Sequence, residues 1–264
     1  MDEFLAPAQA LFFFRQASEK KTSAGRNSSH FFILQMTMKY LDWKEEKIND
    51  FSEKNISDLY DRGFVFTRLN KEVMHQTRSV RIDLGKFEPS SENRRILRKG
   101  EHITLEKYPI PYSKYSWEIG KLAKDFYDAK ADNAFSANKI KELITTANNF
   151  NILLIFSNSL SSPPDTPSGN ITNLGYAICH KNKTILHYSY PFYDLEKSPK
   201  DMGLIMMTKT IVEAKTSGLK YVYLGSLQRP NDVYKLQFSG IEWFDGKEWR
   251  NNVEEVKDIL DKVN

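Results

Sequence analysis

The stretch that decides the fold is Tyr221-Val222-Tyr223-Leu224-Gly225. Aromatic and aliphatic residues run up to a glycine, which is typical of a buried strand followed by a break. The polar cluster Asp232-Val233-Tyr234-Lys235 follows a few residues later. A strand end beside polar side chains is a place where a site can form, so this stretch bears on function as well as on fold.

The residues around this strand predict a hairpin, a helix and a closing hairpin. Two apolar runs, 174–179 and 184–193, flank a four-residue polar turn, which predicts an antiparallel hairpin. A helix is expected from about 199 to 216, because Ser217-Gly218 ends its apolar pattern. After the strand we expect another helix and a final hairpin over 241–249.

The middle of the chain predicts two helices and a strand. Apolar residues recur at helical spacing through 112–148, with a polar break between the two groups. Residues 151–157 are almost wholly apolar and predict a short strand. The run 161–170 is rich in Ser and Pro, so we expect an exposed loop there.

The N-terminal part predicts a smaller β-containing unit. A helical turn ends at Gly63, and strand-like alternation follows at 64–66 and 79–84. Arg94, Arg95 and Arg98 then follow a capping Ser90, and the spacing of Arg94 and Arg98 puts two guanidinium groups on one helix face. Such a face can bind phosphate or simply face solvent, and the pattern alone leaves both interpretations open.

Composition sets limits on the class of protein. The chain has 264 residues and a formal net charge of +4, so any nucleic-acid contact must come from a local basic surface. Its one cysteine, Cys179, excludes an internal disulfide and predicts a packed strand thiol. No apolar run approaches the roughly 18 residues of a spanning helix. We expect a cytoplasmic protein without membrane contact, with residues 1–35 as a poorly ordered extension.

Three blocks of this sequence resemble the aminoacyl-tRNA–protein transferases, the arginyl and leucyl transferases of the N-end rule pathway. The resemblance extends over about residues 56–250. It is carried by Val80-Arg81-Ile82, Phe87, Pro89-Ser90 and Arg94-Arg95, then Tyr190-Pro191-Phe192-Tyr193-Asp194 with Gly203, and finally Gly218-Leu219, 221–225, Tyr234-Lys235, Gly246 and Trp249.

The resemblance implies an α+β fold of the acetyltransferase-like (GNAT-type) kind, a mixed sheet flanked by helices. In that fold two adjacent parallel strands separate and leave backbone groups for an acyl donor. It also implies an N-terminal transferase unit at 36–110 and a catalytic domain at 111–264.

One departure qualifies the resemblance, and a departure from acetyl-CoA enzymes supports it. Family members commonly have cysteines before the Val-Arg-Ile block, whereas 74–78 contain none, so we expect no metal and no cofactor. An acetyl-CoA enzyme usually carries a Gly-rich loop that holds pyrophosphate at a helix N-terminus. The matching place, 198–204, has one glycine and an acidic neighbour, which favours a tRNA-type donor held by distributed basic side chains.

The implied chemistry is attack of a neutral α-amine on an aminoacyl ester. Because the ester is already activated, alignment, removal of one proton and oxyanion stabilisation are the main requirements. The catalytic candidates are Tyr223 and Gly225 at the strand end, and Asp194 as proton acceptor or orienting group. A buried strand residue and a turn-capping carboxylate are the open alternatives for Tyr223 and Asp194.

The substrate-binding candidates are aromatic and basic. They are Arg81, Arg94, Arg95, Tyr190, Tyr193, Tyr234 and Lys235. Arg81 and Arg94 suit an acidic side chain at the acceptor N-terminus, while Tyr234 and Lys235 suit the tRNA 3′ end. Internal pairing, phosphate contact, packing and solvation are their alternatives.

The leading hypothesis is transfer of arginine or leucine from tRNA to a protein with an acidic N-terminal residue, which marks it for degradation. An acyl-CoA-dependent N-acetyltransferase is a competing enzyme. A catalytically silent tRNA- or peptide-binding homologue is the alternative of a different class.

Overall fold

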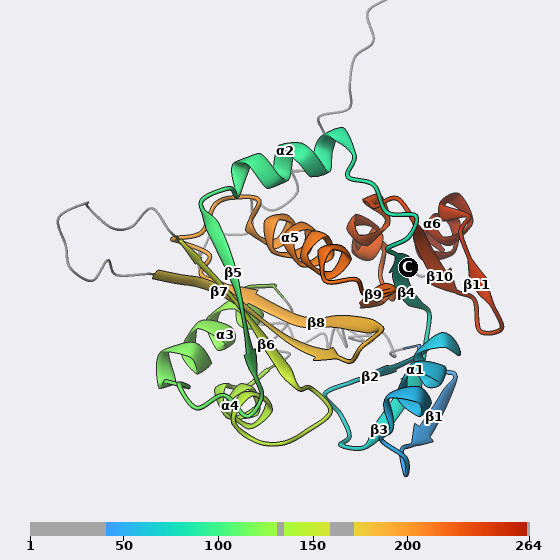
Figure 1. Cartoon of the computed structure of the whole chain (residues 1–264), viewed down its shortest axis with the longest axis horizontal. Coiled ribbons are helices and arrows are strands. Elements are labelled where there is room, and N and C mark those ends of the chain that lie inside the picture. The colour runs from blue at the N-terminus through green and yellow to red at the C-terminus, as the bar shows by residue number, and fades with distance from the viewer. Residues whose placement is uncertain (1–40, 131–134, 159–171, 263–264) are drawn as a thin grey trace, which may run out of the picture. The chain divides into compact units, whose positions relative to one another are not determined.

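The computed structural model describes residues 41–130, 135–158 and 172–262. The expected extension 1–35 and loop 161–170 lie outside the described residues. By their contacts, residues 40–264 form one compact unit, and its described part has the mixed α+β architecture that the sequence predicts (Figure 1).

An eight-stranded sheet organises this unit, in the order β11-β10-β4-β9-β8-β7-β6-β5. Its strands are β4 (Ser79–Asp83), β5 (Ile103–Pro109), β6 (Ile152–Asn158), β7 (Thr172–Lys181), β8 (Ile185–Tyr193), β9 (Tyr221–Ser226), β10 (Ile241–Phe244) and β11 (Trp249–Arg250). Strands β8 and β9 pair in parallel, and the other neighbours are antiparallel. The sheet is therefore mixed, as expected for an acetyltransferase-like fold.

A smaller sheet lies at the N-terminal side, in the order β1-β3-β2. Its elements are β1 (Lys44–Lys47), β2 (Phe64–Phe66), β3 (Val73–Gln76) and the preceding helix α1 (Glu53–Asp61). Gly63 joins α1 to β2 with a φ of +80°, and a Cβ atom there would lie 2.2 Å from the Phe244 ring. Glycine is required at this turn by both backbone conformation and crowding.

Helices cover both faces of the large sheet. They are α2 (Ser91–Lys99), α3 (Trp117–Lys130), α4 (Ala137–Thr145), α5 (Met202–Thr216), the 3₁₀ helix η1 (Pro230–Gln237) and α6 (Val253–Asp261). The Ser90 side chain caps α2 by accepting from the backbone N–H of Asn93, which confirms the expected helix start.

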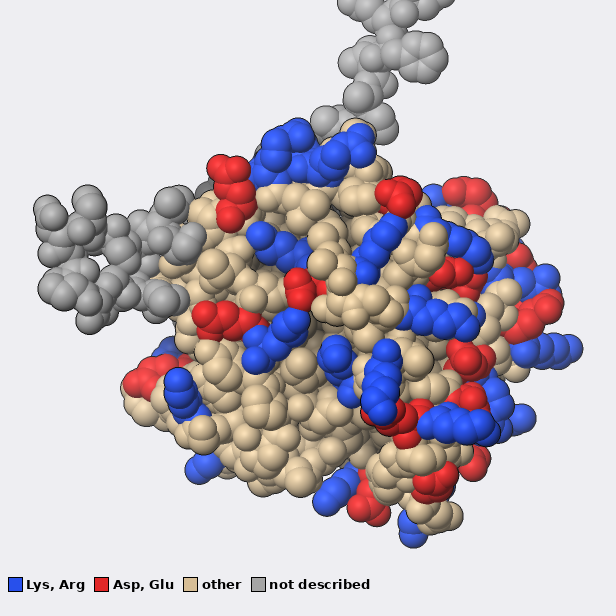
Figure 2. All heavy atoms as spheres, viewed as in Figure 1, with Lys and Arg blue, Asp and Glu red and all other residues tan. Residues whose placement is uncertain are grey.

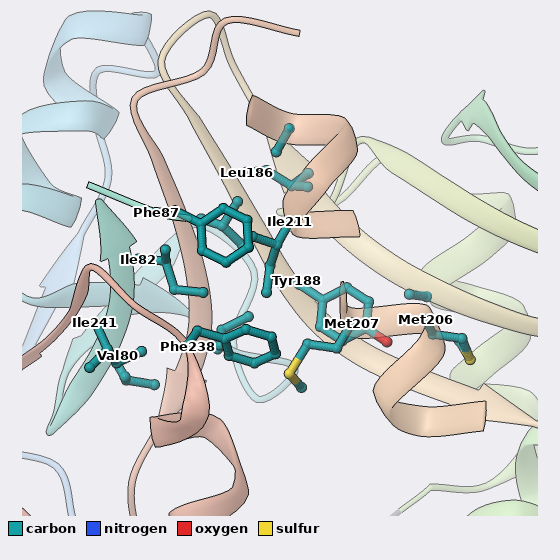
Figure 3. Packing of buried hydrophobic residues seen from close by; sticks show 14 of the residues in the cluster. Val80, Ile82, Phe87, Leu186, Tyr188, Met206, Met207, Ile211, Phe238 and Ile241 are labelled. Atoms are coloured by element: carbon teal, nitrogen blue, oxygen red, sulfur yellow. The ribbon is translucent and has the colours of Figure 1, made fainter. Parts of the chain in front are cut away.

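Two hydrophobic cores form on opposite faces, because successive strand residues point to opposite sides of a sheet. Leu186, Tyr188, Val222 and Leu224 pack with α2, α5 and α6 in one core. Figure 3 shows part of this core, with Tyr188 beside Met206 and Met207 of α5. On the other face, buried residues of α1, β2, β3, α3 and α4 pack against Ile185, Phe192 and Tyr223.

The predicted helices and strands from Gly63 onward are found with small shifts in their ends, while β1, β3, β5 and α6 are additional. Strands β4 and β5 lie in the same sheet as the strands that follow residue 111. The expected boundary at residue 110 therefore runs through this sheet, and the division into 36–110 and 111–264 stays a prediction.

Candidate functional site

The parallel strands β8 and β9 separate partway along their length. They pair only from Ile185 with Tyr221 to His187 with Tyr223. Beyond this point β8 stays paired with β7 as far as Tyr193, while β9 stays paired with β4 as far as Ser226. We call residues 188–193 of β8 and 224–226 of β9 the strand fork. This is the separation that the family resemblance implies.

A bulge shapes the β9 side of the strand fork. Arg81 pairs with Tyr223 and Ser79 with Ser226, so three steps of β9 oppose two steps of β4. Gly225 lies in this bulge with a φ of +79°, and nothing lies within 4 Å of where its Cβ would be. The glycine is thus required by the left-handed backbone rather than by crowding, and the bulge redirects the backbone at the strand end.

Lys235 of η1 reaches the β9 side of the strand fork. Its Nζ donates a hydrogen bond to the carbonyl oxygen of Ser226 at 2.7 Å and lies 3.2 Å from the Asp232 carboxylate. Burial, the neighbouring His180 and the Lys235 charge together lower the pKa of His187 to about 3. Lys235 therefore places a positive charge near the point where the strands separate.

Tyrosine hydroxyls gather around the β8 side of the strand fork. Burial raises the pKa of Tyr193 and of Tyr188, and the nearby Tyr234 of η1 adds to both increases. The Tyr188 hydroxyl is buried and has no hydrogen-bond partner among the residues that the structure describes. Tyr234 is 46% exposed, so it is the member of this group that a ligand reaches first.

The open edge of β8 offers few backbone groups at Pro191. Proline has no N–H, and the Pro191 carbonyl oxygen accepts a hydrogen bond from the Tyr127 hydroxyl of α3 at 3.0 Å. Tyr190, its neighbour, accepts a hydrogen bond from the Arg68 backbone N–H at 2.7 Å. Proline is tolerated in a sheet where no neighbouring strand needs its backbone N–H as a hydrogen-bond donor. The open segment of β8 is such a place.

Asp194 lies just beyond the strand fork, beside a cleft of about 700 Å³ that Tyr193 and α3 also line. Its Oδ1 accepts from the backbone N–H groups of Glu196 and Lys197, each at 2.9 Å. Partial burial opposes ionisation, but these N–H groups and the Lys197 ammonium outweigh it and lower the Asp194 pKa. The carboxylate caps a turn, which is the alternative that the sequence left open, and a lowered pKa makes it a weak base.

Arg81 and Tyr223 belong to an internal network rather than to the strand fork. Arg81 is buried and forms ion pairs with Asp61 and Glu242 at 2.8 and 2.9 Å. Its guanidinium lies between the Tyr221 and Trp249 rings, 3.9 Å from each centroid, and donates to the Tyr223 hydroxyl at 3.2 Å. Burial raises the Tyr223 pKa despite this arginine. The network favours a structural role for both residues.

The arginines of α2 form a separate, exposed group. Arg94 is exposed and donates to the Pro89 carbonyl, Arg95 pairs with Glu92, and Arg98 has no ion-pair partner among the described residues. Lys99 pairs with Asp201, where α5 begins. In Figure 2 basic side chains cover the region where Figure 1 places α2. This group lies on the α5 face of the sheet.

Asp42, Glu45 and His75 bring ligand-type atoms within 4.8 Å of one another. His75 Nδ1 lies 2.7 Å from the Asp42 carboxylate, so a hydrogen bond accounts for the closest contact. The expectation that the protein holds no metal stays a prediction.

Sequence reasoning missed the side chains that other elements bring to β8. Tyr127 lies 64 residues from Pro191 in the chain, and Arg68 lies 122 residues from Tyr190. Neither belongs to a motif, and Tyr127 follows the helical apolar pattern of an ordinary core residue. The proline in the middle of a strong strand pattern was the one available signal.

Comparisons with known proteins support the resemblance drawn from the sequence. No protein-family model matches the chain. A curated relative from Dinoroseobacter shibae, named aspartate/glutamate leucyltransferase, is 26% identical over 181 residues, covering 65% of this chain and 61% of the relative. One of the same name from Alkalilimnicola ehrlichii is 27% identical over 184 residues, covering 67% and 72%. The chain spans about 61% of the length of the first relatives.

Solved structures are similar only at low scores. L-PGS from Bacillus licheniformis gives a TM-score of 0.44 at 12% identity, covering 79% of this chain and 70% of that one. FemX gives 0.39 at 11%, covering 67% and 60%. None of the helices in the described residues is both long and apolar enough to span a bilayer.

Proposed function

We propose that this chain transfers leucine from aminoacyl-tRNA to the α-amine of a protein or peptide whose first residue is aspartate or glutamate. The observation that carries the proposal is the strand fork, where Lys235 and a group of tyrosine hydroxyls meet the point at which β8 and β9 separate. The names of the curated relatives support the donor and the acceptor. The proposal includes marking for degradation and a cytosolic location, where charged tRNA is available.

The proposed reaction needs positioning more than strong acid–base chemistry. The amine nitrogen forms a bond to the ester carbonyl carbon, the bond to the ribose oxygen breaks, the amine loses one proton and the ribose oxygen gains one. Because a free α-amine has a pKa of about 7.7–8.0, a useful neutral fraction exists at neutral pH. Holding the amine and the carbonyl in line therefore supplies much of the rate.

The geometry suggests how residues of the strand fork divide this work. Backbone N–H groups at the Gly225 bulge are our candidates for oxyanion donors. The Lys235 ammonium and the exposed Tyr234 ring suit the last phosphate and the terminal adenine of the donor. Tyr190 and Tyr193 line the acceptor side, and Asp194 orients the amine. Arg81 and Tyr223 do not contact the substrates and instead hold β9 in position.

The walls of the strand fork favour leucine over arginine as the donated residue. Tyr188 points toward Met206 and Met207 on the α5 side (Figure 3). These methionines are buried in the core on that face, and we propose that their apolar, deformable side chains move to admit an aliphatic group. A guanidinium group would need a carboxylate partner when removed from water, and the carboxylate nearest to the strand fork in the chain, Asp194, already caps a turn.

An acyl-CoA donor is less well supported. Helix α5 begins at Asp201, which makes no side-chain capping hydrogen bond and pairs with Lys99, so an anionic group already occupies the position where a pyrophosphate would bind. On the β8 edge, Pro191 offers no N–H donor and its carbonyl is already hydrogen-bonded.

The test is transfer of labelled amino acids from a pool of charged tRNAs to peptides that differ only in their first residue. We expect leucine on peptides that begin with Asp or Glu, and none on those that begin with Asn or Gln. Label from arginyl-tRNA would correct the donor. Binding of tRNA without any transfer would favour a silent homologue, and saturable acetyl-CoA turnover would favour the acetyltransferase.

A Lys235→Met variant ties the activity to the strand fork. Loss of a charged hydrogen bond to the donor should lower kcat/KM by roughly 10- to 100-fold. The control is Lys200→Met, an exposed lysine near the start of α5, which should transfer at the wild-type rate. Equal rates for both variants would remove Lys235 from the site.

A further inference from the structure

Arg68 is a half-buried arginine, and it forms no ion pair with a carboxylate among the described residues. Its guanidinium carbon lies 4.4 Å from the centroid of the Phe135 ring. Stacking on an aromatic face leaves the N–H groups around the guanidinium edge available, and this edge matches a carboxylate bidentately. A charge that is held in a fixed plane, with no carboxylate partner within residues 41–130, 135–158 and 172–262, is suited to recognising an anionic ligand.

A chain of contacts connects Arg68 to the open segment of β8. Its backbone N–H donates to the Tyr190 hydroxyl at 2.7 Å. The Phe135 ring beneath its guanidinium lies 5.1 Å from Tyr190 and 4.4 Å from Tyr127, and Tyr127 donates to the Pro191 carbonyl. Burial raises the Tyr127 pKa, and the Arg68 charge opposes this increase. Arg68 therefore belongs to the aromatic group beside the strand fork.

The other arginine candidates are less suited to read an acidic acceptor. Arg81 is already neutralised by Asp61 and Glu242. Arg94 and Arg95 project from α2, on the α5 face of the sheet. Phe135, Tyr127 and Tyr190 pack in the core on the opposite face, with α3 and α4 (Figure 1). Donor and acceptor can thus approach the strand fork from different faces.

We propose that Arg68 binds the side-chain carboxylate of the acceptor's first residue and so selects aspartate and glutamate. This inference rests on the proposed function and names the residue that sets its acceptor specificity. The acceptor α-amine then lies near Tyr190 and Pro191, within reach of a donor ester between the strands. An amide in place of the carboxylate loses the charge-assisted pair, so Asn- and Gln-initiated peptides bind poorly.

The test is steady-state transfer by Arg68→Met, which removes the charge but keeps an apolar side chain on Phe135. Its KM for Asp- and Glu-initiated peptides should rise at least roughly tenfold, because a hydrogen bond to a charged group contributes one to two decades of affinity. Its KM for leucyl-tRNA should not change, and its discrimination between Asp- and Asn-initiated peptides should collapse. Arg68→Lys keeps the charge without the planar guanidinium, so its peptide KM should lie between those of the wild type and Arg68→Met.

Arg62→Met is the matched control. Arg62 lies before β2, and Arg68 lies after it. The guanidinium carbon of Arg62 also lies over a phenylalanine ring, 5.5 Å from the Phe64 centroid. This variant should keep the wild-type KM values. Thermal unfolding of all variants checks that they are folded. If Arg68→Met does not fold, the comparison of Arg68→Lys with the wild type is the test.

The outcomes separate this inference from the proposed function. Wild-type transfer with unchanged peptide discrimination in the Arg68 variants overturns the role of Arg68 and leaves the function standing. A rise in the KM for tRNA alone assigns Arg68 to a donor phosphate and also overturns it. If the wild type labels no acidic peptide with any amino acid, the proposed function fails and this inference fails with it.

Discussion

The two halves of β8 differ in how their polar groups are satisfied. In the paired half, residues 185–187, His187 Nδ1 lies 2.9 Å from the buried Tyr60 hydroxyl, and its partner Tyr223 is bonded to Arg81. In the strand fork, Tyr188 has no hydrogen-bond partner among the described residues. Within one strand, the side-chain network of the paired half gives way to tyrosines, of which Tyr188 is buried without such a partner and Tyr190 accepts from the Arg68 backbone N–H. Substitutions in the paired half should therefore affect stability, and those near the strand fork should affect activity.

The largest effect that tests this contrast is expected from Arg81→Met. Removing the arginine leaves the Glu242 carboxylate, whose side chain is 14% exposed, with only the exposed Lys86 ammonium, 3.0 Å away, as its ion-pair partner. Breaking a buried ion pair from one side costs about 3–5 kcal/mol. Urea unfolding at pH 7 should show a loss of this size in the free energy of unfolding.

The double variant Arg81→Met/Glu242→Gln is the control for Arg81. It removes the Glu242 charge, which in the single variant has lost its buried partner and keeps only the exposed Lys86, and it should recover part of the lost stability. A single-variant loss below about 1 kcal/mol, with peptide KM raised instead, would assign Arg81 to the acceptor and blur the contrast between the two halves.

The next effect concerns pH and the paired histidines. Burial lowers the pKa of His180 to about 4 and, with His180 and Lys235 nearby, that of His187 to about 3. In the unfolded chain both take protons near pH 6.5. Stability is therefore fully present above pH 6.5 and is lost as pH falls toward 4. At pH 5 the loss is on the order of 2 kcal/mol for each histidine.

Urea unfolding at pH 7 and pH 5 measures this loss. His180→Gln should reduce the difference by about half, since one of the two protonation sites is gone. His102→Gln, at a half-exposed histidine outside both cores, should leave the difference unchanged. Equal stability at the two pH values would contradict the prediction. It would mean that water reaches His180 and His187 in the folded protein and that both can be protonated there.

The sequence predicts the fold better than the site, for a physical reason. Strand and helix patterns are local, so the 221–225 strand, the 184–193 strand and the α2 capping serine were all correctly identified. Side-chain partners are set by tertiary packing. Arg81 was predicted to bind the acceptor, and its position between the Tyr221 and Trp249 rings could not be predicted from the sequence. Arg68 and Tyr127 carried no signal because their neighbours lie far away in the chain.

The smallest expected effect tests the donor side of the contrast, at Arg94 on α2. Its side chain is exposed and makes no ion pair among the described residues, so Arg94→Gln should leave the free energy of unfolding within about 0.5 kcal/mol of wild type. If its guanidinium meets a phosphate, KM for tRNA rises a few-fold, and the slope of log affinity against log salt falls by about 1. Lys47→Gln on β1, an exposed lysine of the small sheet, is the control and should keep the wild-type slope. A changed peptide KM with an unchanged salt slope would instead place Arg94 at the acceptor, and the division of donor and acceptor between the two faces of the sheet would fail.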